Sequence, residues 1–171
     1  ADYIDPGSEQ IRDTTTVVKQ SLMRYPRFGR ILENIGVITV QRKNPRADLM
    51  EVLDKGEARL KKGTSVLLFP QATRSTVFNM ASFNSLGTKL AVRAGVPIVP
   101  IALKTDFHGI GRLIRDAGRL DRSKTVRFRF GPLIPVEGNG KEAHRQAVRF
   151  IAETLREWGS SVTDRGATAE Q

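Results

Sequence analysis

The feature that most constrains this chain is a strand–helix–strand pattern in its first half. Residues 36–40 have the apolar, β-branched character of a strand, and a second apolar strand is expected over 65–69. Between them, Asn44 and Pro45 mark a helix start and Gly63 marks its end. Asn at the cap, Pro at the first helical position and Gly beyond the last turn are the preferred residues there. Two strands joined by a helix favour parallel pairing, so the pattern predicts an α/β architecture.

The same alternation continues along the rest of the chain. Further strands are expected at 14–18, 97–103 and 125–130, and helical segments at 21–35, 84–94 and 141–158. Alternating strands and helices predict an α/β fold in which a largely parallel, mixed sheet is flanked by helices. We expect a single domain over residues 1–158, followed by a disordered tail over 159–171, where small and polar residues dominate.

The strand expected at 125–130 has two different faces. Val126, Phe128 and Phe130 alternate with Arg127 and Arg129. Strict alternation of apolar and charged residues is typical of a strand with one face exposed to solvent.

Composition excludes several classes of function. The chain has no cysteine, which rules out disulfides, thiolate metal sites and a cysteine nucleophile. Its two histidines, His108 and His144, are too few for a histidine-rich metal site and have the character of ordinary surface residues. No apolar run reaches the roughly 20 residues that span a bilayer. No metal is therefore expected, and none of the 171 residues is expected to form a membrane span.

The net charge of +10 indicates anionic partners. Lipid head groups, an acidic carrier protein, phosphorylated substrates and nucleic acid are all candidates, and general solvation by charged residues is the simplest alternative. Aromatic residues alternate with basic ones only at 127–130, so a base-stacking surface is poorly supported. We therefore expect no nucleic-acid partner.

The loop after the strand at 65–69 carries the most promising polar residues. It presents Gln71, Thr73 and Arg74 just beyond the strand's carboxyl end. In α/β proteins, ligands bind at loops in this position. The next strand contains two prolines, which suits an edge or an irregular strand.

These segments resemble the glycerophospholipid acyltransferases of the 1-acylglycerol-3-phosphate acyltransferase type. Residues 69–75, F-P-Q-A-T-R-S, and 96–100, V-P-I-V-P, resemble the family's blocks F-P-E-G-T-R-S and V-P-I-x-P. Residues 36–42 resemble its G-x-x-x-x-x-R block, and 126–136 resemble its closing strand and turn. The resemblance covers about Asp2 to Trp158 and implies a glycerol-3-phosphate acyltransferase-like fold.

The resemblance also implies a catalytic His and Asp in the pattern H-x4-D, with His as base and Asp as its orienting partner. Neither His108 nor His144 has an Asp five residues later. Residues 17–22, however, match the family's V-x-K-x-x-L setting, and counting back from it places the motif Asp at Asp2, with Asp5 as the alternative. The motif His would then precede the first residue by four positions. Residues 1–171 alone are therefore expected to lack activity.

Binding of the acceptor is implied for a further set of residues. Arg74 and Arg42 match the family's phosphate-binding arginines, and Lys19 is a third candidate cation. The guanidinium fork of arginine suits a phosphate. Thr73 either bonds to the acceptor or holds the loop.

Two residues depart from the family pattern. Gln71 stands where the family has Glu, and Ala72 stands where it has Gly. Glutamine keeps an acceptor oxygen but loses the charge and gains a donor. Alanine excludes backbone conformations that only glycine enters easily.

The expected function is transfer of a fatty acyl group from acyl-CoA or acyl carrier protein to a lysophospholipid hydroxyl. The best-matched acceptor is 1-acylglycerol-3-phosphate, which would give phosphatidate, and no cofactor is implied beyond the acyl donor. We expect peripheral attachment to the cytoplasmic face of an anionic membrane. The alternatives are a non-catalytic lipid-binding module on the same fold, an acyltransferase with a different acceptor, and a nucleic-acid-binding domain.

Overall fold

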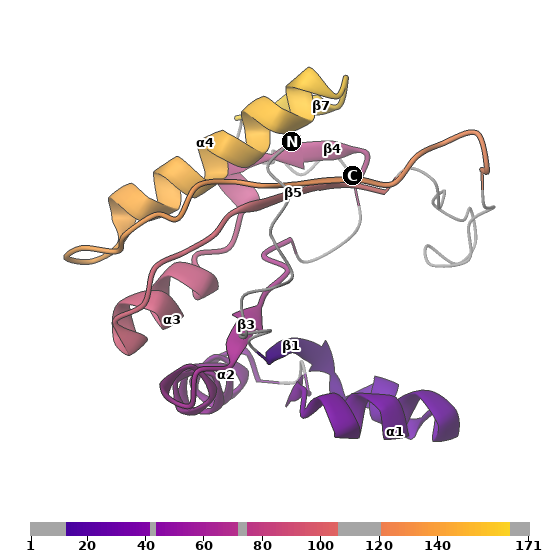
Figure 1. Cartoon of the computed structure of the whole chain (residues 1–171), viewed down its shortest axis with the longest axis vertical. Coiled ribbons are helices and arrows are strands. Elements are labelled where there is room, and N and C mark those ends of the chain that lie inside the picture. The colour runs from indigo at the N-terminus through magenta and orange to yellow at the C-terminus, as the bar shows by residue number, and fades with distance from the viewer. Residues whose placement is uncertain (1–12, 42–43, 72–74, 106–120, 165–171) are drawn as a thin grey trace, which may run out of the picture. The chain divides into compact units, whose positions relative to one another are not determined.

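The computed structural model describes residues 13–41, 44–71, 75–105 and 121–164 (Figure 1). The chain divides into two compact units, the first ending at Phe69 and the second beginning at Pro70. The expectation of one domain over 1–158 stays a prediction. Within the described ranges, no helix is both long and apolar enough to cross a membrane.

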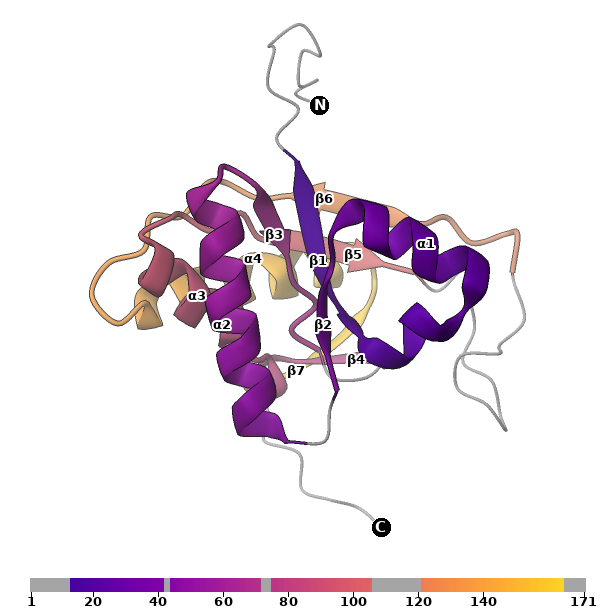
Figure 2. The ribbon, with the colours of Figure 1, turned by 90° about the horizontal axis from the view of Figure 1, so that it is seen from below.

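The first unit contains a three-stranded parallel sheet. Its strands are β1 (Thr14–Lys19), β2 (Ile38–Val40) and β3 (Ser65–Leu67), in the order β2-β1-β3. The first half of β1 pairs with β3 and its second half pairs with β2, so the two outer strands are staggered along the central one. Figure 2 shows β1 crossing between its two partners. The predicted parallel sheet is confirmed, although the two strands that α2 connects each pair with β1 and not with each other.

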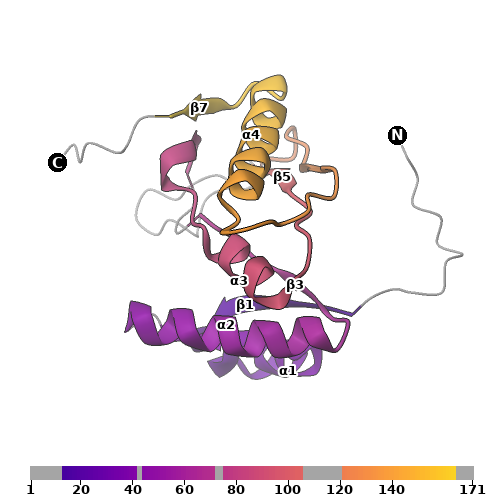
Figure 3. The same cartoon turned by 90° about the vertical axis from the view of Figure 1, so that its left-hand side faces the viewer.

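Two helices lie on one side of this sheet (Figures 2 and 3). Helix α1 (Pro26–Ile35) follows a short 3-10 turn (Gln20–Arg24), and α2 (Pro45–Lys61) connects β2 to β3. The expected interruption of the first helical segment falls at Pro26, because proline cannot donate the helical hydrogen bond and disfavours helix in the residue before it. Gly29 is required at this corner, since a Cβ atom there would lie 2.3 Å from the carbonyl oxygen of Met23.

Helix α2 begins and ends close to where the sequence predicts. The side-chain oxygen of Asn44 accepts hydrogen bonds from the backbone amides of Arg46 and Ala47, both at 3.1 Å. Gly63 lies just beyond the last turn with φ of +82°. The helix buries Val52 against the sheet, where Ile38 is also buried. Thr15 is buried beside them, and its hydroxyl donates to the carbonyl oxygen of Gly36 at 2.9 Å.

The second unit is built around its last helix. Its described elements are β4 (Val77–Asn79), a 3-10 turn (Met80–Ser82), α3 (Leu86–Ala94), β5 (Ile101–Lys104), β6 (Arg127–Phe130), α4 (Lys141–Glu157) and β7 (Ser161–Thr163). Strands β4 and β7 pair in parallel, and β5 and β6 pair antiparallel. Figure 3 shows α4 beside β5, with β7 following the end of the helix. Val148, Ile151 and Leu155 of α4 form one buried cluster with Phe78 and Ala102.

Three expectations about elements of the second unit need correction. The tail is not disordered throughout, because Ser161–Thr163 forms β7; residues 165–171 lie outside the described residues. The partner strand β4 lies in what the sequence indicated was loop. The strand expected at 97–103 begins only at Ile101, with an isolated bridge between Ile98 and Ile134 before it. The two prolines of this segment cannot donate ladder hydrogen bonds, which explains the irregular start.

All four residues of β6 are exposed, and Arg129 lies on the side of the strand that faces the end of α4. The register pairs Arg129 with Ala102, which is fully buried. The Arg129 guanidinium makes two bonds to the Glu157 carboxylate, at 2.5 and 2.8 Å, and lies 5.5 Å from the centre of the Trp158 ring. Phe128 and Phe130 are 61% and 56% exposed. A carboxylate and an aromatic ring at the end of α4 thus hold the exposed Arg129 side chain in place.

Candidate functional site

The carboxyl ends of the three parallel strands in the first unit lie at one edge of the sheet. Lys19 ends β1, Gln41 directly follows β2, and Phe69 lies two residues beyond β3. This is the edge where ligands bind in open α/β sheets. Because β3 pairs only with the first half of β1, the end of β1 extends beyond it and is paired with β2 alone.

Lys19 is the predicted cation that the structure describes at this edge. It lies opposite Val40 in the register, and its side chain is exposed. The chain turns away immediately after it into the 3-10 turn. An ammonium group at a strand end is a point charge that can approach an anion at the sheet edge.

The connection between β2 and α2 is held at its two described ends by hydrogen bonds, one to a side chain and one between backbone groups. The backbone amide of Gln41 donates to Oδ1 of Asp48 at 3.0 Å. The amide of Asp48 in turn donates to the carbonyl oxygen of Asn44 at 2.9 Å. Arg42, the predicted phosphate-binding residue between these anchors, lies outside the described residues. The two bonds fix the positions at which the chain enters and leaves that stretch.

Asp48 is the site residue that sequence reasoning missed. The available signal was its place in the first turn of α2, where an acidic side chain suits the positive end of the helix. Nothing in the sequence indicated that its carboxylate also reaches back to the end of β2.

In the second unit, the segment that follows β3 is anchored at both ends of its described part. The carbonyl oxygen of Pro70 accepts from the amide of Asn84 at 3.3 Å, and the hydroxyl of Ser75 accepts from the amide of Val77 at 3.1 Å. Gln71 lies exposed between these anchors. Thr73 and Arg74 lie outside the described residues, as does Ala72. The structure therefore describes Lys19 and Gln71 among the predicted site residues, in different units, while Asp2 also lies outside the described part of the chain.

His144 is half-buried between helices rather than fully exposed. Its Nδ1 lies 3.2 Å from the hydroxyl of Thr88 on α3, and its ring centre lies 5.9 Å from that of Phe83. Burial lowers the pKa of the His144 imidazole below its ordinary value. These contacts give His144 a packing role in the second unit. Among the described residues, no carboxylates and imidazoles gather in the way a metal site needs.

The family model described as Acyltransferase matches residues 5–104, which is more than half of the chain. The chain belongs to the acyltransferase family. The match includes the β2–α2 connection, the segment after β3 and the irregular start of β5.

Curated relatives extend the similarity beyond the matched stretch. The chain is 35% identical over 145 residues to a 1-acyl-sn-glycerol-3-phosphate acyltransferase of Pseudomonas aeruginosa, covering 82% of this chain and 54% of that relative. It is 32% identical over 164 residues to the enzyme of the same name from Escherichia coli, covering 92% of this chain and 63% of the relative. The chain thus spans between half and two thirds of the length of these acyltransferases.

A solved structure has the same fold. The 1-acyl-sn-glycerophosphate acyltransferase PlsC of Thermotoga maritima matches with a TM-score of 0.62 and 19% identity. The match covers 91% of this chain and 59% of that one. The predicted α/β fold, with a largely parallel mixed sheet flanked by helices, is confirmed by this likeness and by the pairing of the strands.

Proposed function

We propose that this member of the acyltransferase family transfers a fatty acyl group to the hydroxyl of 1-acylglycerol-3-phosphate and so produces phosphatidate. The observation that carries the proposal is the family match over 5–104, which contains the motif blocks at 36–42, 69–75 and 96–100. The names of the Pseudomonas and Escherichia relatives support the choice of acceptor. The donor is a thioester, acyl-CoA or acyl carrier protein, and no other cofactor is needed.

The reaction requires two proton transfers and the exchange of a carbon–sulfur bond for an ester bond. A base removes the proton of the acceptor hydroxyl while the hydroxyl oxygen attacks the acyl carbon of the thioester. The new ester bond forms, the carbon–sulfur bond breaks, and the base returns the proton to the departing thiolate. Asp2 would orient the base through a hydrogen bond, so that the base presents its acceptor nitrogen to the hydroxyl.

The phosphate of the acceptor needs cations near the attacking hydroxyl. Arg74 and Arg42 supply guanidinium forks for it, and Lys19 supplies a third positive charge at the same sheet edge as the β2–α2 connection. Asp48 and Asn44 hold the described ends of that connection. Thr73 and Gln71 add a hydroxyl and an amide that can donate to the oxygens of the acceptor.

Membrane attachment would bring the chain to its lipid acceptor. The 3-10 turn and α1 expose Tyr25, Ile31 and Ile35 together with Arg24 and Arg30. Apolar side chains beside cations favour peripheral binding to an anionic surface. We propose that this surface contacts the cytoplasmic face of the membrane.

The decisive experiment tests the phosphate contact. In the full-length protein, Arg74→Ala should reduce kcat/KM on 1-acylglycerol-3-phosphate by a factor equivalent to about 1.5–3 kcal/mol, the range for hydrogen bonds to charged groups. The loss should be much smaller on a monoacylglycerol that lacks phosphate. Thiol release from acyl-CoA measures both rates. Equal losses on the two acceptors would show that Arg74 is structural.

A non-catalytic lipid-binding module is the second candidate, and Gln71 in place of the family's Glu is the observation that favours it. Such a module would bind lysophosphatidate without turning it over. If the protein binds lysophosphatidate but thiol release stays at the uncatalysed rate, the lipid-binding module is favoured over the enzyme.

A further inference from the structure

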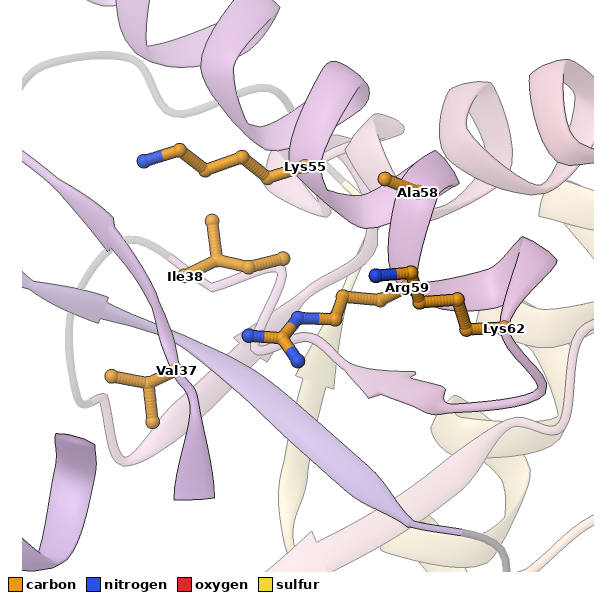
Figure 4. Close-up of a pocket in the computed structure, with 6 residues that line it drawn as sticks. All are labelled: Val37, Ile38, Lys55, Ala58, Arg59 and Lys62. Atoms are coloured by element: carbon orange, nitrogen blue, oxygen red, sulfur yellow. The ribbon is translucent and has the colours of Figure 1, made fainter. Parts of the chain in front are cut away.

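A basic hollow lies in the first unit, between the second half of α2 and the start of β2. Figure 4 shows its lining, and its volume is about 420 Å³. Three cations and three apolar side chains line it: Lys55, Arg59, Lys62, Val37, Ile38 and Ala58. No acidic residue belongs to this lining. The hollow therefore combines a concentrated positive charge with a small apolar floor.

The spacing along α2 explains why the cations gather there. Lys55, Arg59 and Lys62 are separated by four and three residues, and that spacing places side chains on one face of a helix. Lys61, which directly precedes Lys62, pairs with Glu57 at 2.8 Å and is not part of the lining.

Arg59 is held in place before any ligand arrives. Its Nη2 donates to the carbonyl oxygen of Gly36 at 3.0 Å, and that oxygen also accepts from Thr15. A Cβ atom at residue 36 would lie 2.7 Å from the same Nη2, so a larger residue there would displace the guanidinium from this position. A guanidinium carries five N–H donors, so this single bond leaves donors for an anion.

The lysines are less constrained than Arg59. Lys55 pairs with Glu51 at 2.6 Å, but both side chains are exposed enough for the pair to be weak. A ligand with two negative charges can therefore compete for the Lys55 ammonium group. Lys62 is exposed just beyond the last helical turn.

The hollow and the candidate site lie at opposite ends of strand β2. Val37 and Ile38 are at the amino end of β2, whereas Gln41 and Asp48 are beyond its carboxyl end. Along α2, Lys55 and Arg59 follow Asp48 by roughly 10 Å and roughly 16 Å of helix rise. A ligand in the hollow would thus be separate from the acceptor.

We propose that this hollow is a second anion site, which binds a phosphate ester. The fork of Arg59 matches two phosphate oxygens, and the lysines add compact positive charges on either side. Val37 and Ala58 can contact the carbon substituent of an ester, which free phosphate lacks. The ester is either a soluble compound or the head group of an anionic lipid. The inference goes beyond acyl transfer and does not depend on it.

The soluble arm of the test uses phenyl phosphate and the full-length protein. Binding is followed by NMR shifts of the α2 amides, both in the unsubstituted protein and in the double variant Lys55→Gln/Lys62→Gln. The double variant removes two exposed charges and leaves Arg59 unchanged. Affinity should fall at least about 5-fold, as expected for two exposed charge contacts. The matched control is Lys61→Gln, which removes the same kind of charge next to the hollow and should change affinity by less than about 2-fold.

The membrane arm uses phosphatidylcholine vesicles with and without phosphatidylglycerol. If the double variant binds more weakly than the unsubstituted protein to vesicles with phosphatidylglycerol, but not to vesicles without it, the ester is a lipid head group. Unchanged vesicle binding with lost phenyl phosphate affinity would identify a soluble ester. Equal weakening by Lys61→Gln, or no effect of the double variant on either probe, would overturn the proposal. With a detergent-solubilised acceptor, the double variant should transfer the acyl group at the same rate as the unsubstituted protein. This test of the anion site does not depend on whether the proposed acyl transfer is found.

Discussion

The two units of this chain differ in what they bury. In the first, the described buried side chains are few, chiefly Leu32, Ile38, Val52 and Thr15. In the second, α4 alone contributes seven buried residues, and its larger cluster gathers partly buried aromatics around them. The motif residues Lys19 and Arg42 belong to the first unit. The larger described core therefore belongs to the second unit, whereas the sheet edge with Lys19 belongs to the first.

The two long helices show the cause of this difference. Helix α4 presents Val148, Ile151 and Leu155 along one stripe, with Ala152 between them close to β5. Helix α2 has the same length but presents three cations to a hollow and buries Val52. A helix with a wide apolar stripe builds a core, whereas a helix with cations facing a concave surface leaves part of its length available to ligands.

The largest effect should come from breaking the core of the second unit. Leu155→Ala removes a side chain that is 7% exposed within the α4 cluster and should lower the free energy of unfolding by about 2–5 kcal/mol. Urea unfolding measures the change. The matched control is Leu103→Ala in the same unit, where the side chain is largely exposed and the loss should be under about 1 kcal/mol. Equal losses would mean that the core does not lie under α4.

Asp48 tests whether the first unit is organised for binding rather than for burial. Asp48→Ala removes the acceptor of the Gln41 amide and should cost about 0.5–1.5 kcal/mol of stability. It should also raise KM for the phosphate-bearing acceptor more than KM for one without phosphate, with kcat nearly unchanged. Asp48→Asn should restore KM because its amide oxygen can still accept. Asp54→Ala on the same helix is the control, and a matching rise in its KM would argue against a positioning role.

Gln71 offers a smaller effect at the start of the second unit. If a carboxylate is dispensable there, Gln71→Glu should leave activity within a few-fold. If Gln71 selects the acceptor, the substitution should instead shift preference, because glutamine can donate to an anionic oxygen and ionised glutamate cannot. The measurement is an acceptor panel of lysophosphatidate, glycerol-3-phosphate and zwitterionic lysolipids with one donor. Unchanged ratios across the panel would exclude a role in specificity.

The smallest effect concerns pH and His144. Burial lowers the pKa of its imidazole in the folded chain, so the unfolded chain binds the proton more readily. The contribution of His144 to stability is therefore complete above the ordinary histidine pKa of about 6.5 and is lost as pH falls through the lower folded value. Urea unfolding between these pH values should show a slope that His144→Gln reduces. An unchanged slope in the variant would assign it to carboxylates instead.

Much of the fold follows from local signals in the sequence. Asn44, Pro45 and Gly63 bound α2 because caps and proline act within a few residues of the helix ends. Gly95 ends α3 with φ of +65°, a conformation that its missing side chain permits. The motif blocks sufficed to predict the family, since each block is a short run of residues that can be recognised without its neighbours.

Tertiary structure decided what depends on partners that are distant in the sequence. Strands β4 and β7 have three residues each, too few for a periodic pattern, and they exist because each supplies the other's backbone hydrogen bonds. The position of the Arg129 side chain depends on Glu157 and Trp158, and the anchoring of Gln41 depends on a carboxylate on the next helix. The basic hollow likewise needs the cations of α2 brought over the start of β2. Local residue preferences determine where an element begins and ends, but only the folded chain determines which of its faces meets a partner.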